Sequence, residues 1–302
     1  MIVRDDGDVV LRRAMIECVP NFSEGRDTRV VREIAERIAR VSGVTLLGWE
    51  ADADHHRSVI TFAGPADAVR EGALQGVGAA VELIDLNKHH GVHPRVGAAD
   101  VVPFVPLEGS TLEDCVEIAH QAGEQIWERF RVPVYFYEAA ARIPERRPLQ
   151  NTRRTGFDGR PPDIGDYSSH PTAGGVMVGA RNFLIAYNVD LATSDVEIAR
   201  EIATKIRESS GGFRFVKAMG LFLDSAKCSQ VSMNLTNFAE IPLDDLYKTI
   251  QDEAARRGTS IAESELIGFV PKAAFEQAPE FFRRTRGFEE SRIIENRVTR
   301  RA

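Results

Sequence analysis

A stretch rich in proline and glycine divides this chain of 302 residues. Residues 142–175 contain five prolines and five glycines: Pro144, Pro148, Pro161, Pro162, Pro171, Gly156, Gly159, Gly165, Gly174 and Gly175. Proline removes a backbone donor and glycine weakens regular elements, so this stretch is predicted to be a connector. Long connectors often carry function. The sequence therefore predicts two folded parts, residues 15–182 and 183–302.

Strand and helix patterns alternate in both parts. In the first part we expect strands at 15–19, 44–49, 57–63, 101–105 and 132–137, and helices at 27–41, 65–82 and 111–129. In the second part we expect strands at 183–189, 215–223, 228–235 and 259–269, helices at 194–209 and 243–257, and a charged helical tail from 272. This order predicts an α+β fold of two lobes. Each lobe is expected to be a ferredoxin-like mixed β-sheet backed by helices, with a groove between the lobes.

Composition narrows the class of protein. Hydrophobic residues make up 43% of the chain and its formal charge is −7, which argues against a disordered chain and against a nucleic-acid binder. The three cysteines form no CxxC pair, and no apolar run approaches the roughly 18 residues of a membrane span. We expect a cytoplasmic protein with small-molecule partners. Residues 1–14 are interpreted as a weakly ordered leader, with Met15 as an alternative start.

Five of the seven histidines fall in two polar segments: His55, His56, His89, His90 and His93. A helical metal pair of His89 and His93 is disfavoured by Gly91 and Pro94 between and beside them. Neither an HExxH motif nor a thiolate completes a zinc set, so we expect no metal site. Two readings stay open: histidines that satisfy loop backbone groups, and a general acid/base held beside Arg95.

Several segments together resemble the glutamate formimidoyltransferase family, also called glutamate formiminotransferase. They are ECVPNFSEGRD at 17–27, HHRSVITFAG at 55–64, LIDLNKHHGVHPRVGAADVVPFVP at 83–106, GARNFLIAYNVDL at 179–191 and QVSMNL at 230–235. The similarity is collinear from about residue 15 to 271. The larger animal members carry a fused cyclodeaminase domain, for which this chain leaves no room.

The resemblance implies transfer of a formimino group from N-formimino-L-glutamate to tetrahydrofolate, with no metal, as the last part of histidine degradation. It implies two α+β lobes that form a groove, in a homodimer. The histidine of the HPR motif, His93, would be the catalytic residue. The loop that contacts folate in the family matches Gly165, Asp166, Tyr167, Ser168, Ser169, His170, Pro171, Thr172, Ala173 and Gly174.

The chemistry explains why such residue types are needed. The folate amine must lose a proton and the departing nitrogen must gain one, and a single imidazole can do both. Both ligands end in carboxylates, so we expect Arg57, Lys88 and Arg95 to anchor them. A carboxylate would stabilise the amidinium. Glu50 is the first candidate for it, because Gly48-Trp49-Glu50 stands where the family often has an acidic pair, and Asp54 is the second.

Other polar residues keep two interpretations. Asn21 either binds substrate or caps the helix that follows it. Asn188 and Asn234 either line the groove or pair across strands. At the level of function, two alternatives remain beside the leading one: formyl exchange between 5-formyltetrahydrofolate and glutamate, and a noncatalytic folate-binding protein.

Overall fold

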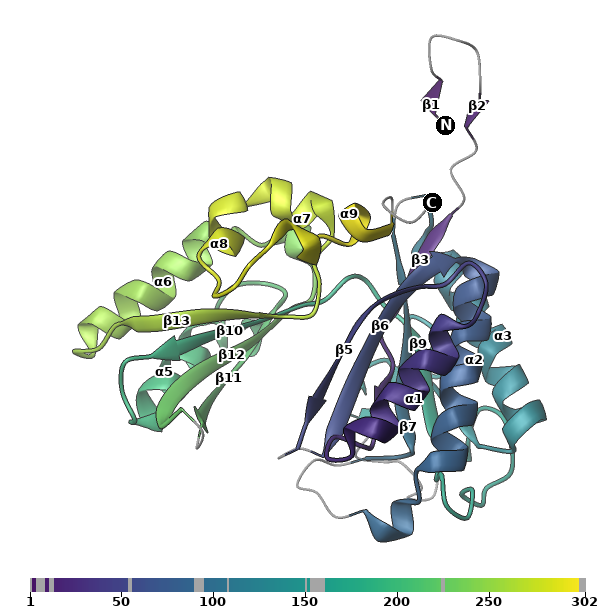
Figure 1. Ribbon diagram of the computed structural model, residues 1–302. Coiled ribbons are helices and arrows are strands. Elements are labelled where there is room, and N and C mark those ends of the chain that lie inside the picture. The colour runs from purple at the N-terminus through teal and green to yellow at the C-terminus, as the bar shows by residue number, and fades with distance from the viewer. Residues whose placement is uncertain are drawn as a thin grey trace. The chain divides into compact units, whose positions relative to one another are not determined.

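The computed structural model describes residues 2–3, 9–10, 14–53, 56–89, 95–107, 109–149, 151–152, 161–223 and 226–298 (Figure 1). The chain divides into two compact units, Met1–Arg181 and Asn182–Ala302. Of the expected leader, the structure describes a short antiparallel pair, β1 (Ile2–Val3) and β2 (Val9–Val10), and Ala14. Within the described residues, no helix combines the length and the apolar character needed to cross a membrane.

The first unit is built on one mixed sheet. Its strands are β3 (Met15–Cys18), β4 (Asn21–Phe22), β5 (Thr45–Asp52), β6 (Arg57–Pro65), β7 (Ala99–Pro106), β8 (Val134–Glu138) and β9 (Val176–Ala180). β3 and β4 both lie between β6 and β7, so the sheet runs β5, β6, β3/β4, β7, β9, β8. The pairs of β9 with β7 and β8 are parallel, and the others are antiparallel. The order β-α-β-β-α-β through β7 is ferredoxin-like, as expected.

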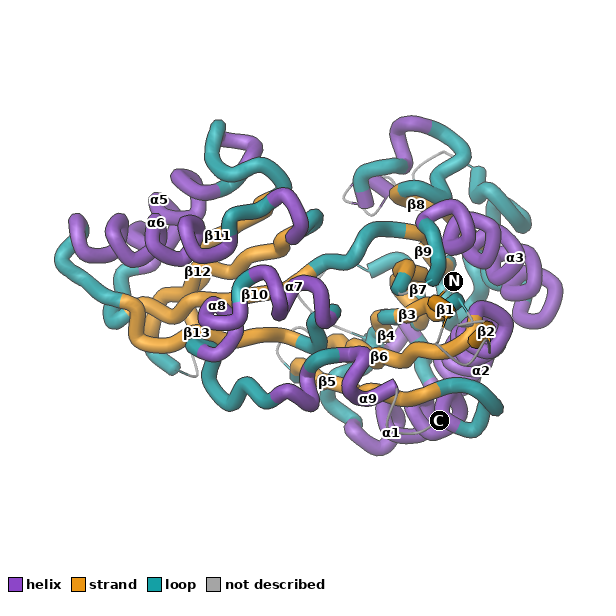
Figure 2. Tube along the Cα trace, turned by 90° about the horizontal axis from the view of Figure 1, so that it is seen from above, coloured by secondary structure: helices purple, strands orange, loops and turns teal. Residues whose placement is uncertain are grey.

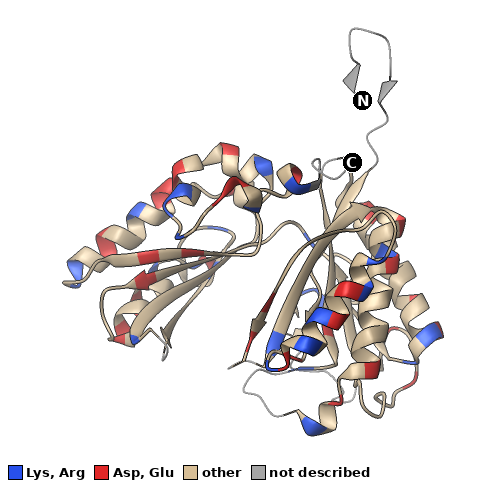
Figure 3. Cartoon of the chain, in the orientation of Figure 1, with Lys and Arg blue, Asp and Glu red and all other residues tan. Residues whose placement is uncertain are grey.

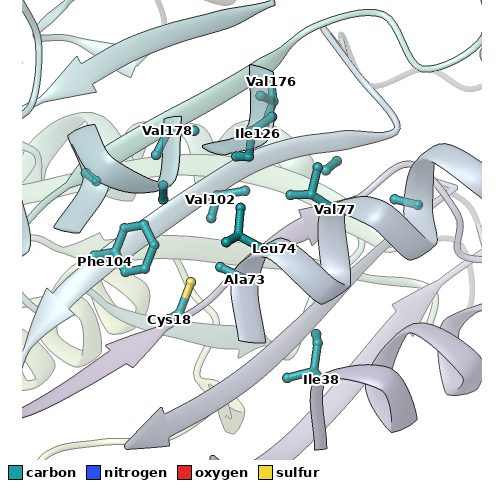
Figure 4. Close-up of a cluster of buried hydrophobic side chains, with 14 of the residues drawn as sticks. Cys18, Ile38, Ala73, Leu74, Val77, Val102, Phe104, Ile126, Val176 and Val178 are labelled. Carbon is teal, nitrogen blue, oxygen red and sulfur yellow. The ribbon is translucent and has the colours of Figure 1, made fainter. Parts of the chain in front are cut away.

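Three helices cover one face of this sheet (Figures 1 and 2). They are α1 (Thr28–Ala39), α2 (Ala66–Leu83) and α3 (Leu112–Phe130). Asp27 caps α1 by accepting a hydrogen bond from the amide of Arg29, and Thr111 and Asp114 form a reciprocal capping box at the start of α3. Between helices and sheet lies a single apolar core, in which Leu74 and Val77 of α2 meet Val102 and Phe104 of β7 (Figure 4).

Strand β9 was not predicted, because its short apolar run directly follows the proline- and glycine-rich stretch. All five of its residues are buried. It lies between β7 and β8, and so joins the end of the connector to the centre of the sheet. The sheet therefore fixes the C-terminal end of the connector in place.

The second unit has a four-stranded sheet in the order β11, β12, β10, β13. Its elements are β10 (Ile185–Leu191), α5 (Val196–Ile206), β11 (Val216–Leu223), β12 (Cys228–Leu235), α6 (Leu243–Arg256) and β13 (Ile261–Ile267), followed by α7 (Lys272–Gln277), α8 (Pro279–Arg283) and α9 (Ile294–Val298). This is again the ferredoxin-like order. The sheet differs from the expected mixed one in that its described pairings are all antiparallel. The reason is that each helical crossover brings its two strands two positions apart, with a strand of opposite direction between them.

The helices of both units are amphipathic. Lys and Arg (blue) alternate with Asp and Glu (red) along α1 and α6, whereas the strands of the first sheet are mostly tan (Figure 3). In α6 the buried positions include Leu243, Leu246, Ile250 and Ala254, which recur with helical spacing. The apolar residues whose spacing predicted these helices are thus the residues on their buried faces.

Candidate functional site

A buried carboxylate, a buried imidazole and a partly buried imidazole meet in the first unit. Glu24 follows β4, His56 immediately precedes β6, and His89 follows a short 3₁₀ helix at Leu86–Lys88. Nδ1 of His56 lies 3.4 Å from Oε1 of Glu24, and Nε2 of His89 lies 3.3 Å from Oε2 of the same carboxylate. The two imidazole rings stack, with centroids 4.2 Å apart and planes inclined by 23°. We call these three residues the Glu24 cluster.

Backbone hydrogen bonds hold the Glu24 cluster in place. Oε1 of Glu24 accepts hydrogen bonds from the amides of Arg26 and Asp27, at 2.8 and 2.9 Å, which fixes the carboxylate at the turn into α1. The amide of Gly25 donates to Nδ1 of His56. A Cβ at position 25 would come within 2.1 Å of the carbonyl oxygen of Asp52, so only glycine fits there.

Arginine side chains lie near the Glu24 cluster and affect its charge. Burial is the main reason that the pKa of His56 is lowered, and the positive charges of Arg26 and Arg95 lower it further, against the opposing effect of the Glu24 carboxylate. Nη1 of Arg95 is buried and has no hydrogen-bond partner among the described residues. A guanidinium in this state is suited to bind a carboxylate.

The expected folate loop lies against the segment that carries the HPR motif. The amide of Leu86 donates to the carbonyl of Thr172, and Nδ2 of Asn87 donates to the carbonyl of Pro171. On the other side of the motif, the amide of Ala98 donates to the carbonyl of Ala173 and that of Gly175 to the carbonyl of Val96. Both chain segments that flank residues 90–94 thus contact residues 171–175.

His170 shapes the end of this loop. Its Nδ1 accepts the amides of Thr172 and Ala173, and its backbone makes a reciprocal pair of hydrogen bonds with Gly174. Ala173 and Gly174 are buried, whereas 165–169 are exposed. Gly165 adopts a left-handed φ of +101° beside the Trp127 ring of α3. The loop is therefore fixed at both ends and exposed in the middle.

The remaining predicted site residues fall at different places. Asn21 of β4 and Glu50 of β5 are both register partners of Val59, so their side chains share one face of the sheet. The strand expected at 44–49 extends further and includes Glu50, because the pairing of β5 with β6 continues to Asp52 and Arg57. Arg57 is thus the first residue of β6. Lys88 is 82% exposed and pairs with Asp85, 3.2 Å away.

His93 lies outside the described residues, as do His90, His55 and Asp54. Its role stays a prediction from sequence. Sequence reasoning missed Glu24, which stood in the quoted ECVPNFSEGRD segment without being singled out. Its two imidazole contacts come from two distant segments, so local spacing held no signal for them.

The family model described as the N-terminal subdomain of the formiminotransferase domain matches residues 15–181, and the model described as the formiminotransferase domain matches residues 186–300. This chain belongs to the formiminotransferase family. The expectation from the sequence motifs is thereby confirmed, and the two matches fall on the two units of the fold.

Curated relatives extend the match over nearly the whole chain. A glutamate formimidoyltransferase of Streptococcus pyogenes serotype M1 is 42% identical over 94% of this chain and 98% of its own length. One of Thermoplasma acidophilum is 42% identical over 96% of this chain and 99% of its own. The formimidoyltransferase-cyclodeaminase of Gallus gallus is 40% identical over 89% of this chain and 52% of its own length. This chain thus matches about half of the length of that larger protein.

Proposed function

We propose that this chain transfers the formimino group from N-formimino-L-glutamate to tetrahydrofolate, giving 5-formiminotetrahydrofolate and L-glutamate. The main support is the 42% identity to two glutamate formimidoyltransferases across almost their full lengths. The contact between residues 171–175 and both flanks of the HPR segment supports a shared site in the first unit. Tetrahydrofolate would be the acceptor co-substrate.

The reaction requires one proton to change partners. N5 of tetrahydrofolate attacks the formimino carbon and forms a C–N bond, and the bond from that carbon to the glutamate nitrogen then breaks. N5 loses a proton and the glutamate nitrogen gains one, so no net proton is released. We assign this transfer to His93, since imidazole accepts and donates protons near neutral pH.

Cationic side chains would hold the carboxylates of both ligands. Arg95 is the first candidate, because its buried Nη1 has no hydrogen-bond partner among the residues that the structure describes. Arg57 begins the adjacent strand β6 and is the second. Lys88 is exposed beside the loop, where it suits a ligand tail that extends into solvent. Asn21 and Glu50, which share one face of the sheet, are assigned to contacts with the formimino donor.

The folate contacts are assigned to residues 165–174. The exposed part, 165–169, offers backbone groups and the side chains of Asp166, Tyr167, Ser168 and Ser169, and Tyr167 is 53% exposed. A phenol ring in this position can stack on a flat pteridine ring. His170 to Gly174 would give the loop its shape.

A donor comparison tests the proposal. Purified protein is incubated with tetrahydrofolate and either N-formimino-L-glutamate or N-formyl-L-glutamate, and the release of glutamate is measured. We expect release from the formimino donor that depends on tetrahydrofolate. Release from the formyl donor alone would instead support formyl exchange, and folate binding without release would support a binding protein.

A cytoplasmic location and a homodimer belong to the same proposal. Both rest on the family resemblance. Size-exclusion chromatography with light scattering measures the mass directly, and a mass equal to one chain would contradict the dimer.

A further inference from the structure

The Glu24 cluster offers ligand atoms that the transfer reaction does not require. One carboxylate oxygen and one nitrogen from each imidazole lie within 4.8 Å of one another, on side chains that are 10% exposed or less. Two imidazoles and one carboxylate are a common ligand set for zinc with an open coordination position. We propose that Glu24, His56 and His89 bind one divalent transition-metal ion of the zinc type.

The distances between the Glu24 carboxylate and the two imidazoles match those between ligands of a zinc ion. Zinc binds nitrogen and carboxylate oxygen at about 2.0–2.2 Å, so two ligands at a tetrahedral angle lie about 3.3–3.5 Å apart. The two carboxylate-to-imidazole distances are 3.4 Å for His56 and 3.3 Å for His89. Each carboxylate oxygen is therefore already at ligand spacing from one ring, Oε1 from Nδ1 of His56 and Oε2 from Nε2 of His89.

A hydrogen bond to the backbone fixes the tautomer of the neutral His89 ring. Nδ1 of His89 lies 3.3 Å from the carbonyl oxygen of Asp85, a contact that needs a proton on Nδ1. In the neutral ring Nε2 then holds a lone pair, and this buried atom has no hydrogen-bond partner among the described residues. A carbonyl that orients a histidine in this way is typical of metal sites.

His56 presents a second lone pair to the same carboxylate. Its Nδ1 accepts the amide of Gly25, so it carries no proton. When both rings are neutral, two lone pairs and a carboxylate face one another, and a positive charge between them is strongly favourable. A metal ion supplies that charge to all three groups at once.

The stacked rings define what must move on binding. In the present arrangement the rings lie nearly parallel, and the Gly25 amide occupies Nδ1 of His56. Binding exchanges that hydrogen bond for the metal and turns the rings until their nitrogens approach to about 3.3 Å. The nearby charges of Arg26 and Arg95 oppose a cation. These costs favour ions that bond strongly to imidazole, such as Zn²⁺ and Co²⁺, over Mg²⁺ or Ca²⁺.

Titration with Co²⁺ tests the site without any substrate. The full chain is treated with a chelator, dialysed, and titrated with Co²⁺ while visible absorption and thermal unfolding are followed. We expect one ion per chain, visible bands of a low-coordinate cobalt site, and a higher Tm. The result is independent of the proposed transferase activity.

Matched variants locate the ion. His89→Asn, His56→Asn and Glu24→Gln should each weaken Co²⁺ binding by at least about tenfold. His120→Asn is the control, because His120 lies on α3 and bonds to the carbonyl of Ala140. Circular dichroism verifies that each variant is folded, and a variant that fails this check leaves the other two to decide.

Three outcomes would overturn the proposal. The first is wild-type protein that shows no visible bands and no rise in Tm. The second is equal binding by wild type and the folded cluster variants. The third is loss of binding in His90→Asn or His93→Asn while the cluster variants still bind, which would place the ion on the HPR segment instead.

Discussion

Nη1 of Arg146 lies 2.6 Å from Oδ2 of Asp163, and both side chains are only 6% exposed. The same carboxylate oxygen accepts the amide of Phe136 in β8, and Nη2 of Arg146 donates to the carbonyl of Pro161. The guanidinium also lies over the ring of Tyr135. This buried pair ties the chain just before the candidate folate loop to the edge of the first sheet.

Arg146→Met should therefore destabilise the fold. Removing one partner leaves the carboxylate of Asp163 buried without its counter-charge, which typically costs about 3–5 kcal/mol. Urea unfolding measures the change. Arg40→Met, which removes an exposed pair with Glu36 on α1, is the control and should cost less than about 1 kcal/mol. Equal losses in the two variants would contradict the assigned role of the buried pair.

Replacing the proposed catalytic histidine should abolish most of the turnover. His93→Ala should lower kcat by about two to four orders of magnitude, the usual scale for loss of a general acid/base. The dependence of kcat on a group that titrates near neutrality should disappear with it. Steady-state kinetics over a range of pH with N-formimino-L-glutamate measure both effects.

Arg95→Ala should act on binding instead. It should raise KM strongly while kcat changes less, because it removes a carboxylate anchor.

His120→Ala is the control for both variants. It should keep wild-type kinetics and lose about 1 kcal/mol of stability with its hydrogen bond to Ala140. Near-wild-type turnover by His93→Ala would refute the proposed proton transfer by His93, and the family assignment would still hold.

A side chain at position 97 should displace the folate loop. A Cβ on Gly97 would lie 1.6 Å from the carbonyl oxygen of Gly175, so the backbone has to shift. We expect Gly97→Ala to cost about 1–3 kcal/mol and to raise the KM for tetrahydrofolate. Gly211→Ala is the control: it meets no atom within 4 Å and is strained only by its φ of +85°. It should lose about 1–2 kcal/mol with an unchanged KM.

The three cysteines should differ in reactivity. Burial raises the pKa of Cys115 to about 12, and burial together with the charge of Glu17 raises that of Cys18 well above its usual value. A thiol reacts as thiolate, so both should be inert at pH 8 in the native protein. Cys228, which is partly exposed, should react slowly. Titration with a disulfide reagent should count one thiol in native protein and three in denaturant.

Chelation should leave the transferase activity intact. The formimino carbon is already electrophilic, and no step of the proposed proton transfer passes through a metal. Activity after exhaustive chelation should therefore match that of untreated protein. Loss of activity that one equivalent of Zn²⁺ restores would give the ion a catalytic role.

The sequence predicted the helices better than the contacts between segments. The apolar spacing of α1 and the start signal at Thr111 depend on residues within one element, and both helices form near the expected bounds. Strand β9 depends on a pairing with β7 and β8 that no local pattern encodes.

The same limit applies to the candidate site. The histidine-rich segments were visible in the sequence, and the structure brings His56 and His89 together. The carboxylate that joins them comes from a distant turn, where Glu24 also accepts two amides. The sequence around Glu24 is explained by its local role at the turn, so nothing in that sequence indicates its long-range contacts.

The two fixed ends of the folate loop have a consequence for how this protein can change over generations. Asp163 secures one end and Gly174 the other, and Gly165 rests on Trp127. Positions 166–169 are exposed and lie outside these constraints. Random substitution there should alter ligand preference at little cost in stability, so these four positions are where new specificities can arise while the scaffold is inherited unchanged.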